Sequence, residues 1–120
     1  MSLISGFKNK IINGSMQVAQ RNTSATGITG LSGTAYVAID RMAYYQYSGN
    51  LVVTISQTAD GPTGFSTCQK VQITTANSTI GTNELICHLQ YNVENKDMQD
   101  LSWGTVNAKP MTLSFWVKSN

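Results

Sequence analysis

The chain has little charge. Only 12% of its 120 residues are Asp, Glu, Lys or Arg, about half of the usual share for a soluble domain. The net charge is +2 and the eight basic residues are scattered, which does not fit a nucleic-acid-binding surface. Thr, Ser, Asn, Gln and Gly are abundant instead. This composition indicates an assembly component whose surface is covered by neighbours, or an extracellular β protein.

Long hydrophobic runs are also missing. No run approaches the ~18 apolar residues of a membrane-spanning helix. The first ten residues, "MSLISGFKNK", lack the signal-peptide order of charge followed by a long apolar core. We therefore expect a protein that is made in a cytoplasm and does not insert into a membrane.

Cysteine and histidine are too few for a metal site. The two cysteines, Cys68 and Cys87, lie on different predicted strands, and His88 is the only histidine. No Cys-x-x-Cys pair or zinc-ligand spacing is present. We favour two buried free thiols, and a Cys68–Cys87 disulfide is the alternative. Nothing in the sequence places a nucleophile or an orienting group beside His88, so we interpret it as a surface or interface residue.

The acidic residues give no stronger sign of chemistry. Glu94, Asp97 and Asp100 lie close together, and paired carboxylates can bind calcium or act in a glycosidase. The calcium-loop pattern is missing, however. We predict a solvated turn, and no enzyme activity, cofactor or metal.

The apolar pattern is that of strands. Val, Ile, Thr, Tyr and Phe dominate, and Gly or Asn interrupts at short intervals, which predicts an all-β domain. We expect strands over 35–47, 50–58, 65–75, 84–94 and 111–118, with a hairpin turn at 48–50, a mobile loop over 22–33, an Asn13-Gly14 turn and a helical turn after Asn95 as its cap. Alternation predicts these inward side chains: Val71, Ile73, Leu85, Cys87, Leu89, Tyr91 and Val93.

This pattern predicts an antiparallel two-sheet sandwich of jelly-roll type. A jelly roll has ~8 strands, so the count is short, and the shortage falls at the C-terminal end. We expect residues 1–33 to form an N-terminal attachment segment and flexible loop, and residues 34–120 to form the β-sandwich.

Three stretches carry a resemblance to a known family. They are "IINGSMQVAQR" at 11–21, "IDRMAYY" at 39–45 and "VENKDMQDLSWGTVNAKPMTLSFWVKS" at 93–119. The chain resembles a family of bacteriophage virion proteins, mostly tail-fibre and adsorption-appendage components. Met42 departs from the family, which usually has Trp there, so a ligand-stacking role of that Trp is not carried over to this position.

The resemblance implies a jelly roll like that of carbohydrate-binding modules. It also implies a domain that continues past Ser119, so strand 111–118 would pair with strands outside this chain or with those of neighbouring subunits. The implied protein is a non-enzymatic virion subunit, with other virion proteins, a homotrimer and host surface polysaccharide as partners. The alternatives are a capsid decoration or head-fibre protein, and a carbohydrate-binding module of a larger depolymerase.

Aromatic residues are the candidate binding residues. The predicted strand 35–47 has tyrosines on both faces, Trp116 lies opposite the apolar stripe of 111–118, and Trp103 lies in a turn. Exposed aromatics stack on sugar rings, but Trp and Tyr also anchor protein interfaces. We therefore predict glycan or subunit contacts for Trp116, Trp103, Tyr44, Tyr45 and Tyr47. Packing over the end of the sandwich, or under a loop, is the alternative for the tryptophans.

Overall fold

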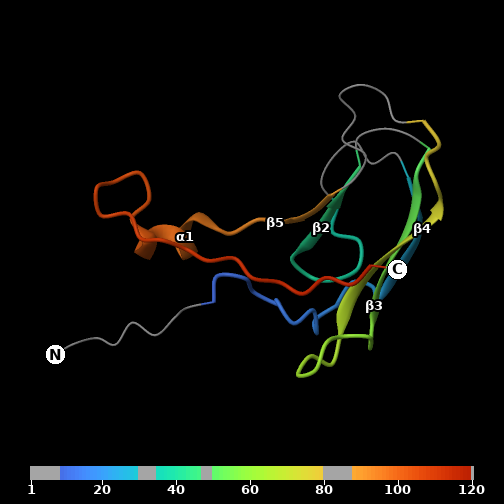
Figure 1. The fold of residues 1–120 in the computed structure, drawn as a ribbon, viewed down its shortest axis with the longest axis horizontal. Coiled ribbons are helices and arrows are strands. Elements are labelled where there is room, and N and C mark those ends of the chain that lie inside the picture. The colour runs from blue at the N-terminus through green and yellow to red at the C-terminus, as the bar shows by residue number, and fades with distance from the viewer. Residues whose placement is uncertain (1–8, 30–34, 47–49, 80–87, 120) are drawn as a thin grey trace. The chain divides into compact units, whose positions relative to one another are not determined.

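The computed structural model describes residues 9–29, 35–46, 50–79 and 88–119. The chain divides into two compact units (Figure 1). Asn13–Tyr91 form one, here called the two-sheet unit. Met1–Ile12 and Asn92–Asn120 form the other, here called the helical-turn unit.

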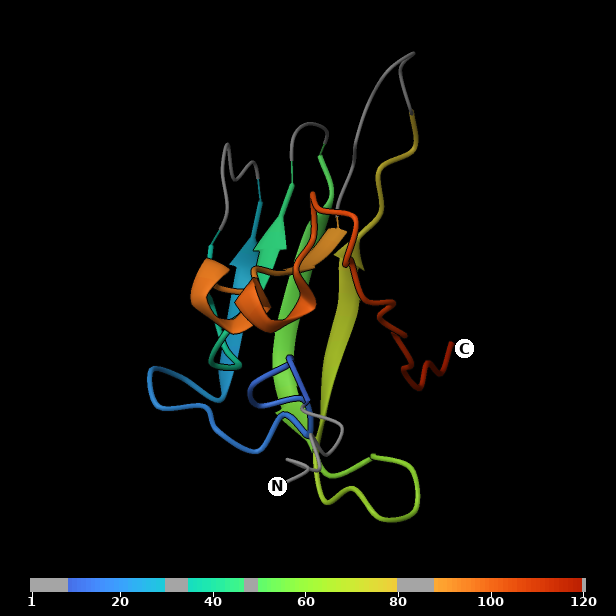
Figure 2. The same ribbon diagram turned by 90° about the vertical axis from the view of Figure 1, so that its left-hand side faces the viewer.

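The first sheet of the two-sheet unit is antiparallel and has the order β1-β3-β4 (Figure 2). Its strands are β1 (Ser24–Ile28), β3 (Val52–Thr58) and β4 (Cys68–Thr75). The central strand β3 alternates as its sequence predicts, because Val53 and Ile55 are fully buried between more exposed neighbours. The predicted strands 50–58 and 65–75 are thus confirmed.

The second sheet pairs β2 (Met42–Tyr45) with β5 (His88–Tyr91), also antiparallel. Tyr44 of β2 lies opposite Leu89 of β5, and Ala35 forms a further bridge to Tyr44. β5 confirms residues 88–91 of predicted strand 84–94, whereas residues 92–94 belong to no strand. Residues 80–87, with Leu85 and Cys87, lie outside it.

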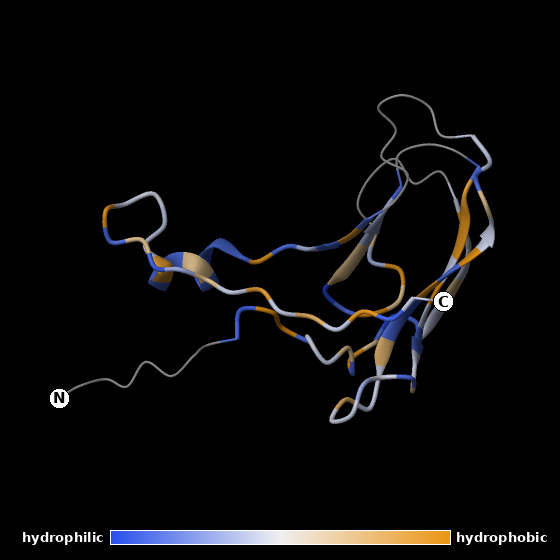
Figure 3. Cartoon of the chain, in the orientation of Figure 1, coloured by the Kyte–Doolittle hydropathy of each residue, from blue (hydrophilic) through white to orange (hydrophobic). Residues whose placement is uncertain are grey.

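The two sheets share one hydrophobic core. Tyr44 of β2 packs in the same buried cluster as residues of β1 and β3, and apolar positions follow both sheets in Figure 3. The cluster contains Ile28, Ala38, Tyr44, Leu51, Val53 and Ile55. Burial of these side chains, worth about 1.5–3 kcal/mol each for the larger ones, is what holds the sheets together.

The segment before β1 is bound to this unit by polar contacts. Met16 N–H donates to Asn13 O at 2.8 Å, which confirms the predicted turn. The Asn13 side-chain amide donates to Val18 O and Asp40 O, each at 2.9 Å. The Gln57 side chain of β3 donates to Met16 O at 2.7 Å.

The helical-turn unit contains α1 (Asn95–Met98) and the 3-10 turn η1 (Gln99–Leu101). The predicted helical turn is confirmed, but its cap is not, because Glu94 occupies the N-cap without a side-chain hydrogen bond. Lys10 donates to the Asp97 carbonyl and forms an ion pair with Asp100. Glu94 and Asp100 are exposed, as expected for the predicted solvated turn, and Asp100 in addition pairs with a lysine.

The described residues thus form antiparallel sheets with one short α-helix, so the all-β prediction is confirmed. Neither sheet closes on itself. Within the described residues, no helix has the length and apolar content that a membrane span needs.

Three predicted elements are wrong because long-range contacts override the local pattern. Predicted strand 35–47 is broken by a turn in which Arg41 takes a left-handed φ of 71°. Predicted loop 22–33 contains β1, which pairs with β3 and buries Ile28. Among the described residues the predicted hairpin across 48–50 is not seen, since β2 pairs with β5 while β3 pairs with β1 and β4.

The fourth wrong element is the strand at 111–118. Residues 109–119 have no regular secondary structure, and all of them are exposed. An extended segment becomes a strand only through hydrogen bonds to a neighbouring strand. The sequence pattern is therefore that of a strand, while no described sheet includes the segment.

Candidate functional site

An open groove lies on the helical-turn unit beside Trp103. Its volume is about 540 Å³, and its lining is Val93, Asn95, Met98, Gln99, Ser102 and Trp103. The spacing of residues 95, 98, 99 and 102 places their side chains on one face of the helical turn. Half-buried Val93 and Met98 supply apolar surface, and exposed Asn95 and Gln99 supply amides.

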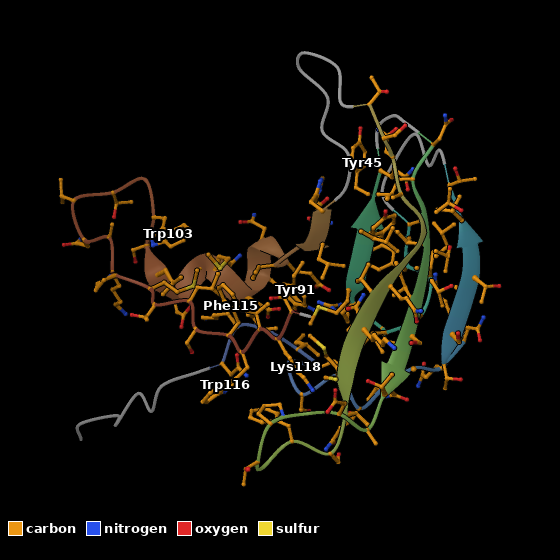
Figure 4. All side chains as sticks on the ribbon, turned by 45° about the vertical axis from the view of Figure 1, so that its right-hand side comes forward. Tyr45, Tyr91, Trp103, Phe115, Trp116 and Lys118 are labelled. Atoms are coloured by element: carbon orange, nitrogen blue, oxygen red, sulfur yellow. The ribbon has the colours of Figure 1, made fainter. Side chains whose placement is uncertain are left out.

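The fold of the following turn fixes Trp103. Ser102 takes a left-handed φ of 52° and Gly104 one of 82°, so the chain reverses at the end of the 3-10 turn. Lys109 N–H donates to Leu101 O at 2.8 Å. The Trp103 indole Nε1–H donates to Lys109 O at 2.9 Å. This bond holds the ring in one orientation while 52% of the side chain stays exposed, beside the helical turn in Figure 4.

The groove is suited to a neutral polar ligand. An exposed aromatic ring offers a flat apolar face, and a few amides and a hydroxyl around it can fix orientation. None of the lining side chains carries a charge.

The second exposed feature is the C-terminal tract, defined as residues 111–117. Its apolar side chains are exposed: Met111 45%, Leu113 64%, Phe115 75%, Trp116 78% and Val117 82%. Figure 4 shows Phe115 and Trp116 on this segment. Large exposed apolar side chains gathered in one short segment are uncommon on a monomeric protein and are typical of interaction sites. Trp116 thus lies in this tract and outside the groove lining.

The predicted tyrosines are not gathered at either feature. Tyr44 is 1% exposed, and its hydroxyl donates to Gln46 in the core, so it cannot meet a ligand in this structure. Tyr45 is half-buried and stacks on His88, with ring centroids 4.9 Å apart. Tyr47 lies outside the described residues.

The described histidine and carboxylates do not gather as metal ligands. His88 lies 3.2 Å from the Gln90 side chain, Nε2 to Oε1, in addition to its stack on Tyr45. Among the residues that the structure describes, no three His, Cys, Asp or Glu side chains gather as metal ligands do. Cys68 is half-buried with its sulfur 3.2 Å from the Thr58 hydroxyl.

The sequence analysis singled out Trp103 but not Asn95 and Gln99, which line the same groove. Two amides four residues apart on a helical turn were the available signal. No protein-family model, curated protein or solved structure matches this chain.

Proposed function

We propose that the chain is a non-enzymatic structural subunit of a bacteriophage virion, from a tail fibre or adsorption appendage. The observation that carries this proposal is the C-terminal tract, whose large apolar side chains are 45–82% exposed. A subunit buries such a surface against its neighbours in the particle. The low charge of 12% and the three virion-like phrases support the same conclusion.

The finer fold that we propose is a jelly-roll sandwich completed by further strands. Five strands are described, and a jelly roll has ~8. Ile73 lies at an edge strand with 59% of its side chain exposed, which leaves room for an additional strand. The partners in this proposal are other virion proteins and two further copies of the chain, which together form a homotrimer.

Location on the particle tests the structural role. Antibodies against the full chain, imaged on intact phage by gold labelling, should mark the tail or its appendage. Empty heads separated from tails should then lack the chain by immunoblot. Labelling of the shell, with retention on purified heads, would instead identify a capsid decoration protein.

We propose the Trp103 groove as the surface that contacts host glycan. Its uncharged lining favours neutral sugars over acidic ones. Titration calorimetry of the full chain with neutral and acidic host oligosaccharides tests this. Trp103→Ala should weaken binding about tenfold or more, as interface aromatics do, whereas Trp116→Ala, the matched control outside the groove, should bind normally. Absence of heat at millimolar ligand, or equal loss in both variants, would contradict the assignment.

A further inference from the structure

The core of the two-sheet unit is open at β4 and β5. Ile73 of β4 pairs with Val53 of β3, so its side chain lies on the core-facing side of the sheet. Leu89 of β5 pairs with buried Tyr44 and therefore lies on the core-facing side of the second sheet. Yet Ile73 is 59% exposed and Leu89 is 53% exposed.

These two side chains were predicted to be inward and are exposed for a common reason. β4 is an edge strand of its sheet, and β5 pairs only with β2 among the described residues. Both lie toward the same lateral edge of the unit in Figure 2. Val71, two residues before Ile73 on the same face of β4, is still packed against the core cluster. The core therefore ends at an edge that another strand could extend.

The C-terminal tract has the properties of such a strand. Met111, Leu113, Phe115 and Val117 alternate with Thr112, Ser114 and Trp116, so they share one face when the segment is extended. The tract contains no charge and no proline, both of which native edge strands use against pairing. At seven residues, the tract is nearly as long as β4, which has eight.

We propose that the C-terminal tract of one copy adds as a strand to the β4 edge of a second copy of this chain. Main-chain hydrogen bonds form the join, and Leu113 and Phe115 cover Ile73 and extend the core. The exposed apolar surface of the tract is roughly 600 Å² when aromatic side chains count ~150–250 Å² each. An equal area buried on the acceptor brings one contact to roughly 1,200 Å², the lower end of stable interfaces.

The partner is a second copy because one chain carries both complementary surfaces. The tract and the β4 edge are different surfaces, so each contact between copies is head-to-tail. Two or three copies can therefore close a ring in which every tract and every β4 edge is paired. An unpaired edge and an apolar strand would otherwise promote aggregation. This inference rests on the proposed function, since it names the partner of an assembly subunit.

Cysteine cross-linking of the purified full chain tests the join. In a background with Cys68→Ser and Cys87→Ser, an Ile73→Cys chain is mixed under oxidising conditions with chains carrying one cysteine at each position from 111 to 117. Disulfide-linked pairs on a non-reducing gel should rise and fall with period two, in favour of 111, 113, 115 and 117. A flat profile, or no pairs, overturns the proposal.

The same cysteines separate a second copy from the chain's own tract. A single chain with both Ile73→Cys and Leu113→Cys should give linked oligomers, and intramolecular closure in a monomer would refute the proposal. Light scattering adds an independent readout. The cysteine-intact full chain should contain two or three copies, Phe115→Asp should be monomeric, and Ser114→Asp, on the opposite face, should assemble normally. A monomeric parent chain would also overturn the proposal.

Failure here is distinguishable from failure of the proposed function. If cross-linking fails while antibodies still mark the tail, the virion assignment stands and another virion protein covers the tract. If cross-linking succeeds and phage particles lack the chain, the strand exchange stands and the virion assignment is wrong.

Discussion

Replacing Tyr44 with phenylalanine should destabilise the two-sheet unit through one hydrogen bond. The Tyr44 hydroxyl donates to Gln46 Oε1 at 2.9 Å, and Gln46 Nε2 donates to Leu51 O at 2.8 Å. Gln46 is fully buried and Tyr44 is 1% exposed. Tyr44→Phe keeps the ring and leaves a buried amide oxygen without this donor, which costs about 1–3 kcal/mol.

Urea unfolding, followed by far-UV circular dichroism of the backbone, measures this loss of unfolding free energy. With a slope of about 1–3 kcal/mol per M, the midpoint should fall by roughly 1 M. The control is Gln46→Met, which removes the acceptor oxygen. In that background Tyr44→Phe should cost less by about 1 kcal/mol or more, the coupling energy of a contacting pair. An equal cost in both backgrounds would refute the reasoning.

Three further predictions follow from packing and polar contacts. Ile55→Ala should lower the free energy of unfolding by about 2–5 kcal/mol because it leaves a cavity in the core, whereas Val106→Ala, at a fully exposed side chain outside the C-terminal tract, should change the urea midpoint of the chain little. Gly61→Ala should destabilise by about 1 kcal/mol or more, because its Cβ would lie 2.7 Å from the Phe65 carbonyl oxygen; a thermal melting temperature equal to that of the parent would contradict this. Lys10→Met should speed amide hydrogen exchange in the helical turn several-fold, since the ion pair holding it is lost, and unchanged exchange would show that the pair contributes nothing.

The sequence predicts well where alternation and burial agree. Val53 and Ile55 alternate with less buried residues, and β3 forms where expected. β1 could not be predicted, because "SATGI" is weak in strand formers and its pairing with β3 comes from residues about 30 positions away. The turn at Arg41 could not be predicted either, because tertiary contacts impose its positive φ.

The candidate site was predictable only in part. Trp103 and Trp116 stand out in the sequence, and both are exposed. Tyr44 looked equivalent, but its burial depends on which sheet faces the other, and strand parity alone does not give that. The alternation pattern correctly placed Ile73 and Leu89 on the core-facing sides of their sheets. Their exposure could not be read from it, because a core-facing residue is buried only if another element covers it.

The polar attachment of the segment starting at Asn13 sets where this module can be cut. The side chains of Asn13 and Gln57 join that segment to the turn before β2 and to β3, and β1 then occupies one edge of β3. A portable version that started at residue 34 would strip β3 of a neighbour and expose Val53 and Ile55 from that direction. Any fusion or transplant of the module should therefore begin upstream of Asn13.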